Sequence, residues 1–357
     1  MSKISVLIVD DSALIRKVLT EILSSDKGIE VVGSAADPFI ARDKIKKLNP
    51  DVITLDVEMP KMDGITFLRN LMRLRPMPVV MISTLTEAGA GVTLQALELG
   101  AVDFIEKPKF DVSATIKEYA EEIISKVKAA SRVSQEVLAR NAERLKTRQS
   151  ADESRDKLVA KGNFLNTTDK IIAIGSSTGG TEAVKDVLMG LPADVAGIVV
   201  SQHIPPAFSR SFADRLNELT QLNVSEARDG DQLRPGVVYI APGDRHLIVK
   251  RSGAKYYCVL DDGPEVNRHK PSVEVMFSSV AKCAGPNAMG VMLTGMGSDG
   301  AKGMLEMKEQ GALNIVQDEK SSVVWGMPGA AVKIGAADKQ FSLDKISDEI
   351  IRYCSEK

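Results

Sequence analysis

The sequence predicts an α/β protein of two domains, each built on a doubly wound, mostly parallel sheet. Its 357 residues, 44% of them hydrophobic, exceed what one ordinary core accommodates and suit two domains. In both halves, strand-length apolar runs alternate with segments of helical periodicity, which is typical of a parallel sheet covered on both faces. A charged stretch without aromatic residues, 131–161, separates the two patterns and predicts a partly helical, solvated linker.

The first half predicts five strands that alternate with five helices. Strands are expected at residues 4–9, 30–34, 52–55, 78–82 and 102–105, and helices at 13–24, 39–48, 65–74, 92–99 and 117–128. The helices carry apolar residues at spacings of three and four, whereas strands this apolar suit burial on both sides. We therefore assign residues 1–125 to a (βα)5 domain and residues 126–167 to a charged linker.

The second domain, residues 168–357, predicts a similar alternation. Strands are expected at 171–174, 197–201, 237–241, 291–294 and 313–316, and helices at 181–189, 209–219, 272–283 and 301–310. Residues 246–250 and 256–260, separated by Ser252 and Gly253, predict a β-hairpin added to this sheet.

Composition and charge exclude several classes of protein. The formal net charge of -2 gives no electrostatic reason to expect nucleic acid or an anionic membrane as a partner. The three cysteines form no CxxC pair, which argues against a disulfide framework and against a cysteine-based zinc site. No apolar run reaches the roughly 20 residues that span a bilayer. We expect a cytoplasmic monomer without direct membrane insertion.

Polar side chains gather at one predicted sheet edge of the first domain. In parallel α/β sheets, ligands bind beyond the carboxyl ends of the strands. The side chains expected there are Asp10 and Asp11 after the first strand, Asp56 after the third, Ser83 and Thr84 after the fourth, and Lys107 after the fifth. Clustered carboxylates repel one another unless a cation is present, and Mg²⁺ typically binds one or two carboxylates. This edge therefore predicts a Mg²⁺ site.

With that ion bound, Asp56 can stay ionised and attack a phosphoryl donor as a carboxylate nucleophile. Lys107 would neutralise the new phosphoryl oxygens, and Ser83 would donate a hydrogen bond to them. The alternative is that Asp10 and Asp11 cap the next helix and Asp56 lies in a turn. The arrival of all these side chains at matching strand ends favours the phosphorylation site.

Four motifs carry a resemblance to a known family, namely 9–12 (VDDS), 55–64 (LDVEMPKMDG), 83–84 (ST) and 107–108 (KP). Through them, residues 1–125 resemble the response-regulator receiver family, with its CheY-like fold. The resemblance implies phosphorylation at Asp56 and Mg²⁺ held by Asp11 and Asp56 with Asp10 nearby. It also implies a phosphoryl switch through Phe104 and Lys107, with Ser83 or Thr84 as the switch hydroxyl.

A glycine-rich run at 175–180 follows one predicted strand and opens a helix. It does not complete a P-loop, because Thr181 follows it where a lysine is required. It does not match the dinucleotide pattern either, because Ser177 stands in place of the second glycine. Residues 175–179 match G-x-S-x-G on a strand-to-helix turn, the context that exposes a serine hydroxyl. Ser177 is therefore the candidate nucleophile.

His203 is the candidate general base, and Asp299 is the candidate carboxylate that orients its imidazole. Each follows a strand that ends at the edge expected for Ser177. His246 precedes a strand, which is the opposite polarity, and His269 lies among positive neighbours, where it could contact substrate. Asp299 by itself would be interpreted as the N-cap of the next helix. Three roles on three strand ends favour catalysis, although the order Ser–His–Asp differs from that of α/β-hydrolases.

A second resemblance rests on the motifs 174–182 (IGSSTGGTE), 202–206 (QHIPP), 241–244 (APGD), 267–273 (NRHKPSV) and 293–300 (LTGMGSDG). Through them the second half resembles the Rossmann-like catalytic domain of the CheB family of chemotaxis protein-glutamate methylesterases. Ser176 stands where the family motif has alanine, and the register of the motif selects Ser177.

The CheB resemblance implies hydrolysis of glutamate γ-methyl esters on methyl-accepting chemotaxis receptors, with release of methanol, and deamidation of receptor glutamines. It implies a chemotaxis histidine kinase as phosphodonor, backbone oxyanion donors at Met296 and near Thr178, and no cofactor for ester hydrolysis. It also implies that the unphosphorylated receiver restricts access to the catalytic face. A second function class stays open, a response regulator whose C-terminal domain is a non-catalytic partner- or nucleotide-binding module.

Overall fold

The computed structural model describes residues 3–83, 87–107, 115–140, 143 and 170–356. The chain divides into two compact units, residues 1–155 and 156–357. Thr84, one of the predicted switch hydroxyls, lies outside the described residues, as does most of the predicted linker. None of the helices in the described ranges combines the length and the apolar character needed to cross a membrane.

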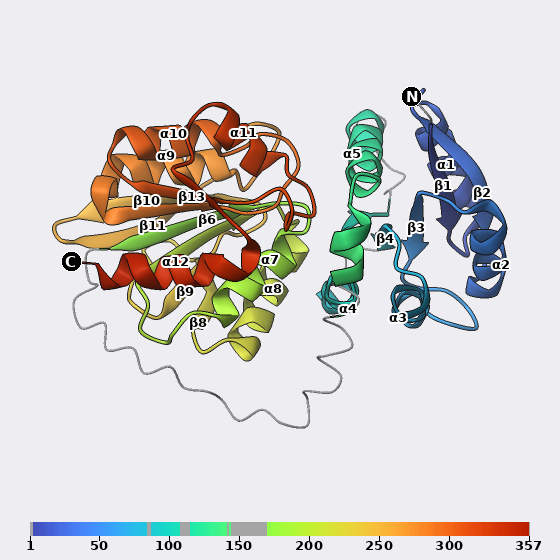
Figure 1. Cartoon of the computed structure of the whole chain (residues 1–357), viewed down its shortest axis with the longest axis horizontal. Coiled ribbons are helices and arrows are strands. Elements are labelled where there is room, and N and C mark those ends of the chain that lie inside the picture. The colour runs from blue at the N-terminus through green and yellow to red at the C-terminus, as the bar shows by residue number, and fades with distance from the viewer. Residues whose placement is uncertain (1–2, 84–86, 108–114, 141–142, 144–169, 357) are drawn as a thin grey trace. The chain divides into compact units, whose positions relative to one another are not determined.

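The first unit contains the predicted five-stranded parallel sheet, in the order β2-β1-β3-β4-β5 (Figure 1). Its strands are β1 (Ile4–Val9), β2 (Ile29–Ala35), β3 (Val52–Asp56), β4 (Val79–Ser83) and β5 (Asp103–Glu106). Its helices are α1 (Ala13–Ser24), α2 (Pro38–Leu48), α3 (Gly64–Leu74), α4 (Glu87–Glu98) and α5 (Thr115–Ala130). The strand order reverses between β1 and β3, and ligands of such sheets bind at that point.

Side-chain caps determine where three of these helices begin. Ser12, Asp37 and Asp63 each accept the backbone N–H three residues further on, at the starts of α1, α2 and α3. The cap of α1 is thus Ser12, which leaves the carboxylates of Asp10 and Asp11 for other contacts. At the other end of the unit, α5 continues past residue 125, and a further helical segment covers residues 135–140.

The second unit contains a seven-stranded parallel sheet in the order β14-β13-β12-β6-β7-β9-β8. Its strands are β6 (Ile171–Ser176), β7 (Gly197–Gln202), β8 (Asn223–Glu226), β9 (Val237–Ile240), β12 (Ala288–Met292), β13 (Leu313–Gln317) and β14 (Lys339–Phe341). The predicted hairpin is present as β10 (His246–Ser252) and β11 (Lys255–Asp261), but these strands form a two-stranded sheet of their own.

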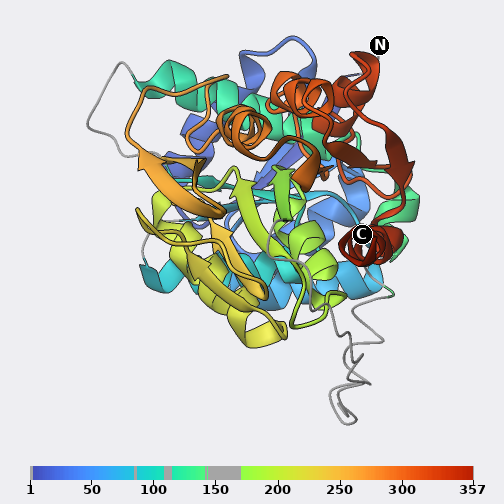
Figure 2. The ribbon, with the colours of Figure 1, turned by 90° about the vertical axis from the view of Figure 1, so that its left-hand side faces the viewer.

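Helices cover both faces of this seven-stranded sheet, as Figures 1 and 2 show. One face carries α9 (Val273–Ala284), α10 (Ala301–Glu309) and α11 (Met327–Lys333), and the other carries α7 (Gly180–Met189), α8 (Pro206–Leu219) and α12 (Leu343–Ser355). The buried side chains of α9 and α10, among them Phe277 and Met304, join those of the sheet in one apolar cluster. The strand order reverses between β6 and β12, which makes the loops after these strands the expected site.

Two strands and two α-helices of the second unit are absent from the sequence prediction, namely β8, β14, α11 and α12. The two strands are short edge strands with mostly polar residues, so they lack the apolar run of a buried strand. Helix α12 does have buried residues at a helical spacing, Ile346, Ile350 and Tyr353, a signal that the sequence contained. The strand expected at 291–294 ends at Met292. The backbone N–H of Thr294 donates to the side-chain Oε1 of Gln317, and its carbonyl accepts from the N–H of Ser177, on the turn after β6.

Candidate functional site

The predicted carboxylates of the first unit come together at the point where its strand order reverses. Oxygens of Asp10, Asp11 and Asp56 lie within 4.8 Å of one another. Asp10 and Asp56 are buried and Asp11 is exposed. Oδ2 of Asp10 is buried and accepts no hydrogen bond from the residues that the structure describes. A hard divalent cation such as Mg²⁺ would supply the missing partner, so the donor set fits that ion.

Electrostatics in this cluster favour a cation as well. Burial is the largest cause that raises the pKa of Asp56 to about 6, and the neighbouring Asp10 adds to it, although Lys107 opposes both. Burial is likewise the main cause of the raised pKa of Asp10. The Lys107 ammonium lies 2.8 Å from Oδ2 of Asp56 and 3.6 Å from Oδ2 of Asp10. It therefore offsets part, but not all, of the cost of burying two carboxylates.

Two of the predicted switch residues lie on the two strands that follow β3 in the sheet, with Ser83 at the end of β4 and Phe104 on β5. The hydroxyl of Ser83 accepts a hydrogen bond from Oγ1 of Thr93 at 3.0 Å, and its carbonyl accepts from the backbone N–H of Lys107 at 2.8 Å. Phe104 is buried on β5, and the Lys126 ammonium lies 5.2 Å from the centre of its ring. The same ammonium donates to the Phe104 carbonyl, so α5 is tied to the strand that carries the predicted switch aromatic.

Ser177 lies on the tight turn between β6 and α7. Its backbone N–H donates to the carbonyl of Thr294 at 3.0 Å, which joins the turn to the segment after β12. The turn requires glycine at residue 180, because a Cβ there would lie 2.2 Å from Oε1 of Gln202. The backbone therefore passes close to β7, the strand that leads to His203.

The two adjacent serines have different surroundings. Ser176 is fully buried, and its hydroxyl donates to Oε1 of Gln202 at 2.6 Å. The amide of Gln202 in turn donates to the carbonyls of Ser177 and His203, at 3.0 Å each. Ser176 and Gln202 thus hold the backbones of both candidate catalytic loops, and only the hydroxyl of Ser177 faces the imidazole.

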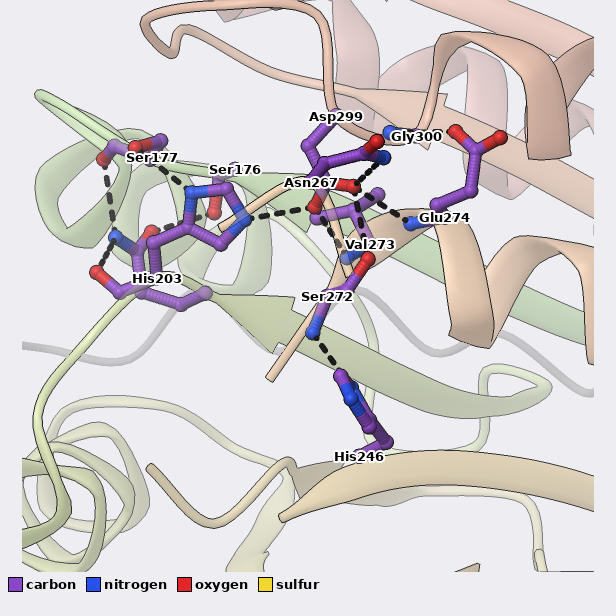
Figure 3. Close-up of polar contacts among 11 residues, drawn as sticks. Ser176, Ser177, His203, His246, Asn267, Ser272, Val273, Glu274, Asp299 and Gly300 are labelled. Atoms are coloured by element: carbon purple, nitrogen blue, oxygen red, sulfur yellow. Dashed lines mark hydrogen bonds and ion pairs between the residues drawn. The ribbon is translucent and has the colours of Figure 1, made fainter. Parts of the chain in front are cut away.

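The structure brings Ser177, His203 and Asp299 into one hydrogen-bonded chain, drawn in Figure 3. Nδ1 of His203 lies 3.1 Å from Oγ of Ser177, and Nε2 lies 2.8 Å from Oδ2 of Asp299. An ionised carboxylate only accepts, so the imidazole proton sits on Nε2. Nδ1 then presents its lone pair to the serine hydroxyl, which is the arrangement a general base needs.

Asp299 accepts hydrogen bonds from five donors. Besides His203, they are the hydroxyl of Ser272, the amide of Asn267 and the backbone N–H groups of Val273 and Glu274. The last two belong to the first turn of α9, whose positive end favours an anion. Burial by itself would raise the pKa of Asp299, but His203, Asn267 and Ser272 outweigh it and lower the pKa to about 2.

Asp299 is not the N-cap of α10, the alternative interpretation of its position. The N-cap is Gly300, at φ +84°, without a side-chain cap. The carboxylate of Glu274, from α9, accepts the Gly300 N–H at 3.0 Å instead. Asp299 is therefore turned toward His203 and the start of α9, while Glu274 holds the start of α10.

The other two histidines lie close to the triad. His269, whose role the sequence left open, stacks on the ring of His203, with centroids 3.7 Å apart and planes inclined by 17°. His246 is buried and contacts Pro264 and Ser272. Sequence reasoning assigned no role to Asn267, Ser272 or Glu274. Two of these lie in the motif 267–273, but no spacing rule connects that motif to Asp299.

The predicted oxyanion donors flank Ser177. Thr178 follows it directly, and the carbonyl of Thr178 accepts the hydroxyl of Thr294 at 3.0 Å. Met296 directly follows Gly295, and a Cβ added to Gly295 would lie 2.9 Å from the Cβ of Ser177. The segment after β12 therefore passes against the serine only because residue 295 has no side chain.

Comparisons with known proteins match both units. A family model described as CheB methylesterase matches residues 172–350, and one described as response regulator receiver domain matches residues 6–120. A protein-glutamate methylesterase/protein-glutamine glutaminase 1 of Xanthomonas euvesicatoria pv. vesicatoria is 57% identical over 348 residues, which cover 98% of this chain and 96% of that protein. A protein-glutamate methylesterase/protein-glutamine glutaminase of Hydrogenovibrio crunogenus is 54% identical, covering 98% and 99%.

A solved structure supports the fold of the second unit. The crystal structure of the Thermotoga maritima CheB methylesterase catalytic domain is 40% identical, with a TM-score of 0.50. It covers 51% of this chain and 97% of that chain.

Proposed function

This chain belongs to the CheB methylesterase family, and we propose that it is a receiver-regulated enzyme of chemotaxis that demethylates chemoreceptors. Its substrates are glutamate γ-methyl esters, from which it releases methanol, and specific receptor glutamines, from which it releases ammonia. The observation that carries this proposal is the hydrogen-bonded chain Ser177–His203–Asp299 at the reversal point of the second sheet. A module that only bound a partner or a nucleotide would not need such a chain.

Ser177 is the nucleophile of the proposed reaction. Its Oγ attacks the carbonyl carbon of the γ-ester while its proton passes to Nδ1 of His203, 3.1 Å away. The resulting imidazolium is stabilised by Asp299, which is ionised at neutral pH because its pKa is about 2. The backbone N–H groups of Met296 and Thr178 donate to the oxyanion of the tetrahedral intermediate.

The second half of the reaction returns the proton. When the tetrahedral intermediate collapses, the bond to the methoxy oxygen breaks, and this oxygen takes the proton from His203 and leaves as methanol. Water then attacks the glutamyl ester of Ser177 with His203 as base, which frees the serine and the glutamate carboxylate. For a glutamine substrate, the leaving nitrogen takes the proton at the same point, and ammonia departs.

Phosphorylation of Asp56 controls this activity in the proposal. Mg²⁺, held by Asp10, Asp11 and Asp56, would neutralise the charge that gathers when a phosphoryl group meets these carboxylates. The Asp56 carboxylate attacks the phosphorus of the donor, the bond from phosphorus to the imidazole nitrogen of the kinase's phosphohistidine breaks, and the histidine leaves. Lys107 then pairs with the new phosphoryl oxygens. The hydroxyl of Ser83 donates to one of these oxygens in place of its present contact with Thr93, and Phe104 passes the change on.

The proposed partners follow from the family. The cytoplasmic signalling helices of methyl-accepting chemotaxis receptors are the substrate, and a chemotaxis histidine kinase is the phosphodonor. We propose residues 1–125 as the receiver, 126–167 as the linker and 168–357 as the catalytic domain of a cytoplasmic monomer.

The test is methanol release from methylated receptor membranes by the full-length chain with Mg²⁺ and an acyl phosphate. Ser177→Ala should lose as much as about 10⁶-fold in kcat, and His203→Ala a similar amount. Ser176→Ala should stay active, because the Ser176 hydroxyl is buried against Gln202, whereas the hydroxyl that faces His203 is that of Ser177. If Ser176→Ala were inactive and Ser177→Ala active, the assignment of Ser177 as the nucleophile would be wrong. If His203→Ala were fully active, His203 would not be the base.

A further inference from the structure

The third histidine of the catalytic unit, His246, is buried at the start of β10 with 1% of its surface exposed. Its Nδ1 accepts the backbone N–H of Ser272 at 3.1 Å, and its Nε2 lies 2.9 Å from the carbonyl of Pro264. Since Nδ1 accepts, the ring proton sits on Nε2 and is donated to that carbonyl. Both ring nitrogens of a neutral imidazole are thus satisfied by backbone groups.

These two backbone groups are the ends of one loop, residues 264–272. The tip of the loop is a tight turn in which Val266 and His269 exchange two backbone hydrogen bonds, at 3.1 and 3.0 Å. The two residues between them, Asn267 and Arg268, have φ values of +54° and +67°, as a type I′ turn requires. The reciprocal bonds close the tip of the loop, and His246 closes its base.

The loop delivers three groups to the triad. The amide of Asn267 donates to Oδ1 of Asp299 at 2.7 Å, and the hydroxyl of Ser272 donates to the same oxygen at 2.8 Å. The ring of His269 stacks on that of His203. Ser272 is bound to His246 through its N–H and to Asp299 through its hydroxyl, so a single residue separates the buried histidine from the carboxylate, as Figure 3 shows.

We propose that His246 is a positioning residue for the reaction. By fixing both ends of the loop 264–272, it holds Asp299 and the imidazole of His203 in the orientation that proton transfer requires. This inference rests on the proposed function, because it assigns a task to His246 only if His203 and Asp299 act on Ser177. Misplacement of a catalytic group by about 1 Å can cost roughly 100-fold in rate.

The test compares three variants of the full-length chain by methanol release from methylated receptor membranes, with Mg²⁺ and an acyl phosphate present. His246→Phe keeps a planar ring and removes both hydrogen bonds, so kcat should fall by about 10- to 100-fold with little change in KM. His246→Gln offers an amide that can donate and accept, and should recover part of kcat. Val280→Ala shortens a buried side chain of α9 away from the loop, and should lower the melting temperature while kcat stays unchanged.

Three results would overturn the proposal. The first is that His246→Phe has the kcat of the wild type per folded molecule. The second is that the kcat of His246→Gln is no higher than that of His246→Phe. The third is that Val280→Ala loses as much kcat as His246→Phe does. If His246→Phe does not fold, Ser272→Ala replaces it, because it removes only the hydroxyl bond to Asp299. That variant should lose kcat and Ser272→Thr should restore it, and equal kcat in the two would again overturn the proposal.

Ser177→Ala, measured in the same series, separates a failure of the proposed function from a failure of the role of His246. If Ser177→Ala keeps its activity, the proposed function fails and the role of His246 falls with it. If Ser177→Ala is inactive while His246→Phe is fully active, only the role of His246 is refuted.

Discussion

Asp299→Asn should cost the catalytic unit both stability and activity, because the carboxylate is buried and holds the imidazole of His203. The carboxylate is 2% exposed, so solvent screening removes little of its interaction energy. Its pKa is lowered from 3.8 to about 2, which corresponds to roughly 2 to 3 kcal/mol that favours the ionised form in the folded state. Because the folded pKa is depressed, this stability is present above about pH 4 and is lost as the pH falls toward 2.

The activity loss follows from the tautomer of His203. An asparagine amide in place of Oδ2 would donate to Nε2 of His203, which moves the ring proton to Nδ1, where it faces Ser177. The base then has no lone pair for the serine proton, and kcat should fall by about 10⁴-fold, as in serine proteases with the same change. Methanol release from receptor membranes measures this loss.

Urea unfolding at pH 7 measures the stability loss. Trp325 is the single tryptophan of the chain and lies in the second unit, so its fluorescence reports that unit alone. Asp214→Asn, at an exposed position of α8, is the matched control and should leave the free energy of unfolding unchanged. If Asp299→Asn unfolds like the wild type at pH 7, or if wild type loses no more stability than the variant between pH 4 and pH 2.5, the reasoning is refuted.

Two further changes test the regulatory unit. Asp56→Asn should abolish Mg²⁺-dependent labelling by a phosphodonor. Folding raises the pKa of Asp56 from 3.8 to about 6, so the wild type loses stability as the pH rises through this window. In calorimetry at pH 7.5 with a chelator present, the variant should therefore be more stable than the wild type by up to about 3 kcal/mol. Persistent labelling or a less stable variant would contradict the site. Removal of the residues before about 160 should leave a folded esterase, since domains joined by charged linkers usually fold alone. This fragment should be faster than the unphosphorylated full chain and should not respond to phosphodonor. A soluble fragment slower than the full chain would mean that the receiver assembles the site.

Most of the fold could be predicted from the sequence, because hydrophobic periodicity directly reports which local segments are buried and on which faces. All five strands of the first sheet and the five central strands of the second lie within a few residues of their predicted places. Periodicity failed at β8 and β14, since an edge strand buries too little to need apolar residues. It also predicted the hairpin, but as an addition to the main sheet, whereas β10 and β11 form a two-stranded sheet of their own.

The candidate triad could be named from the sequence for a related reason. Parallel strands deliver the residues that follow them to one edge, so a serine, a histidine and an aspartate after three such strands were expected to meet there. The sequence could also favour Ser177 over Ser176 from the motif register. Only the structure explains the difference, because the partner that buries the Ser176 hydroxyl, Gln202, comes from another strand.

What only the tertiary structure decided is the set of contacts that holds the triad in place. The donors to Asp299, the stacking of His269 on His203 and the burial of His246 all depend on the path of the loop 264–272. That loop has no periodic pattern, and its shape depends on two residues at positive φ and on a histidine about twenty residues earlier in the chain. Sequence periodicity records local burial, whereas such contacts are fixed by the packing of segments far apart in the chain.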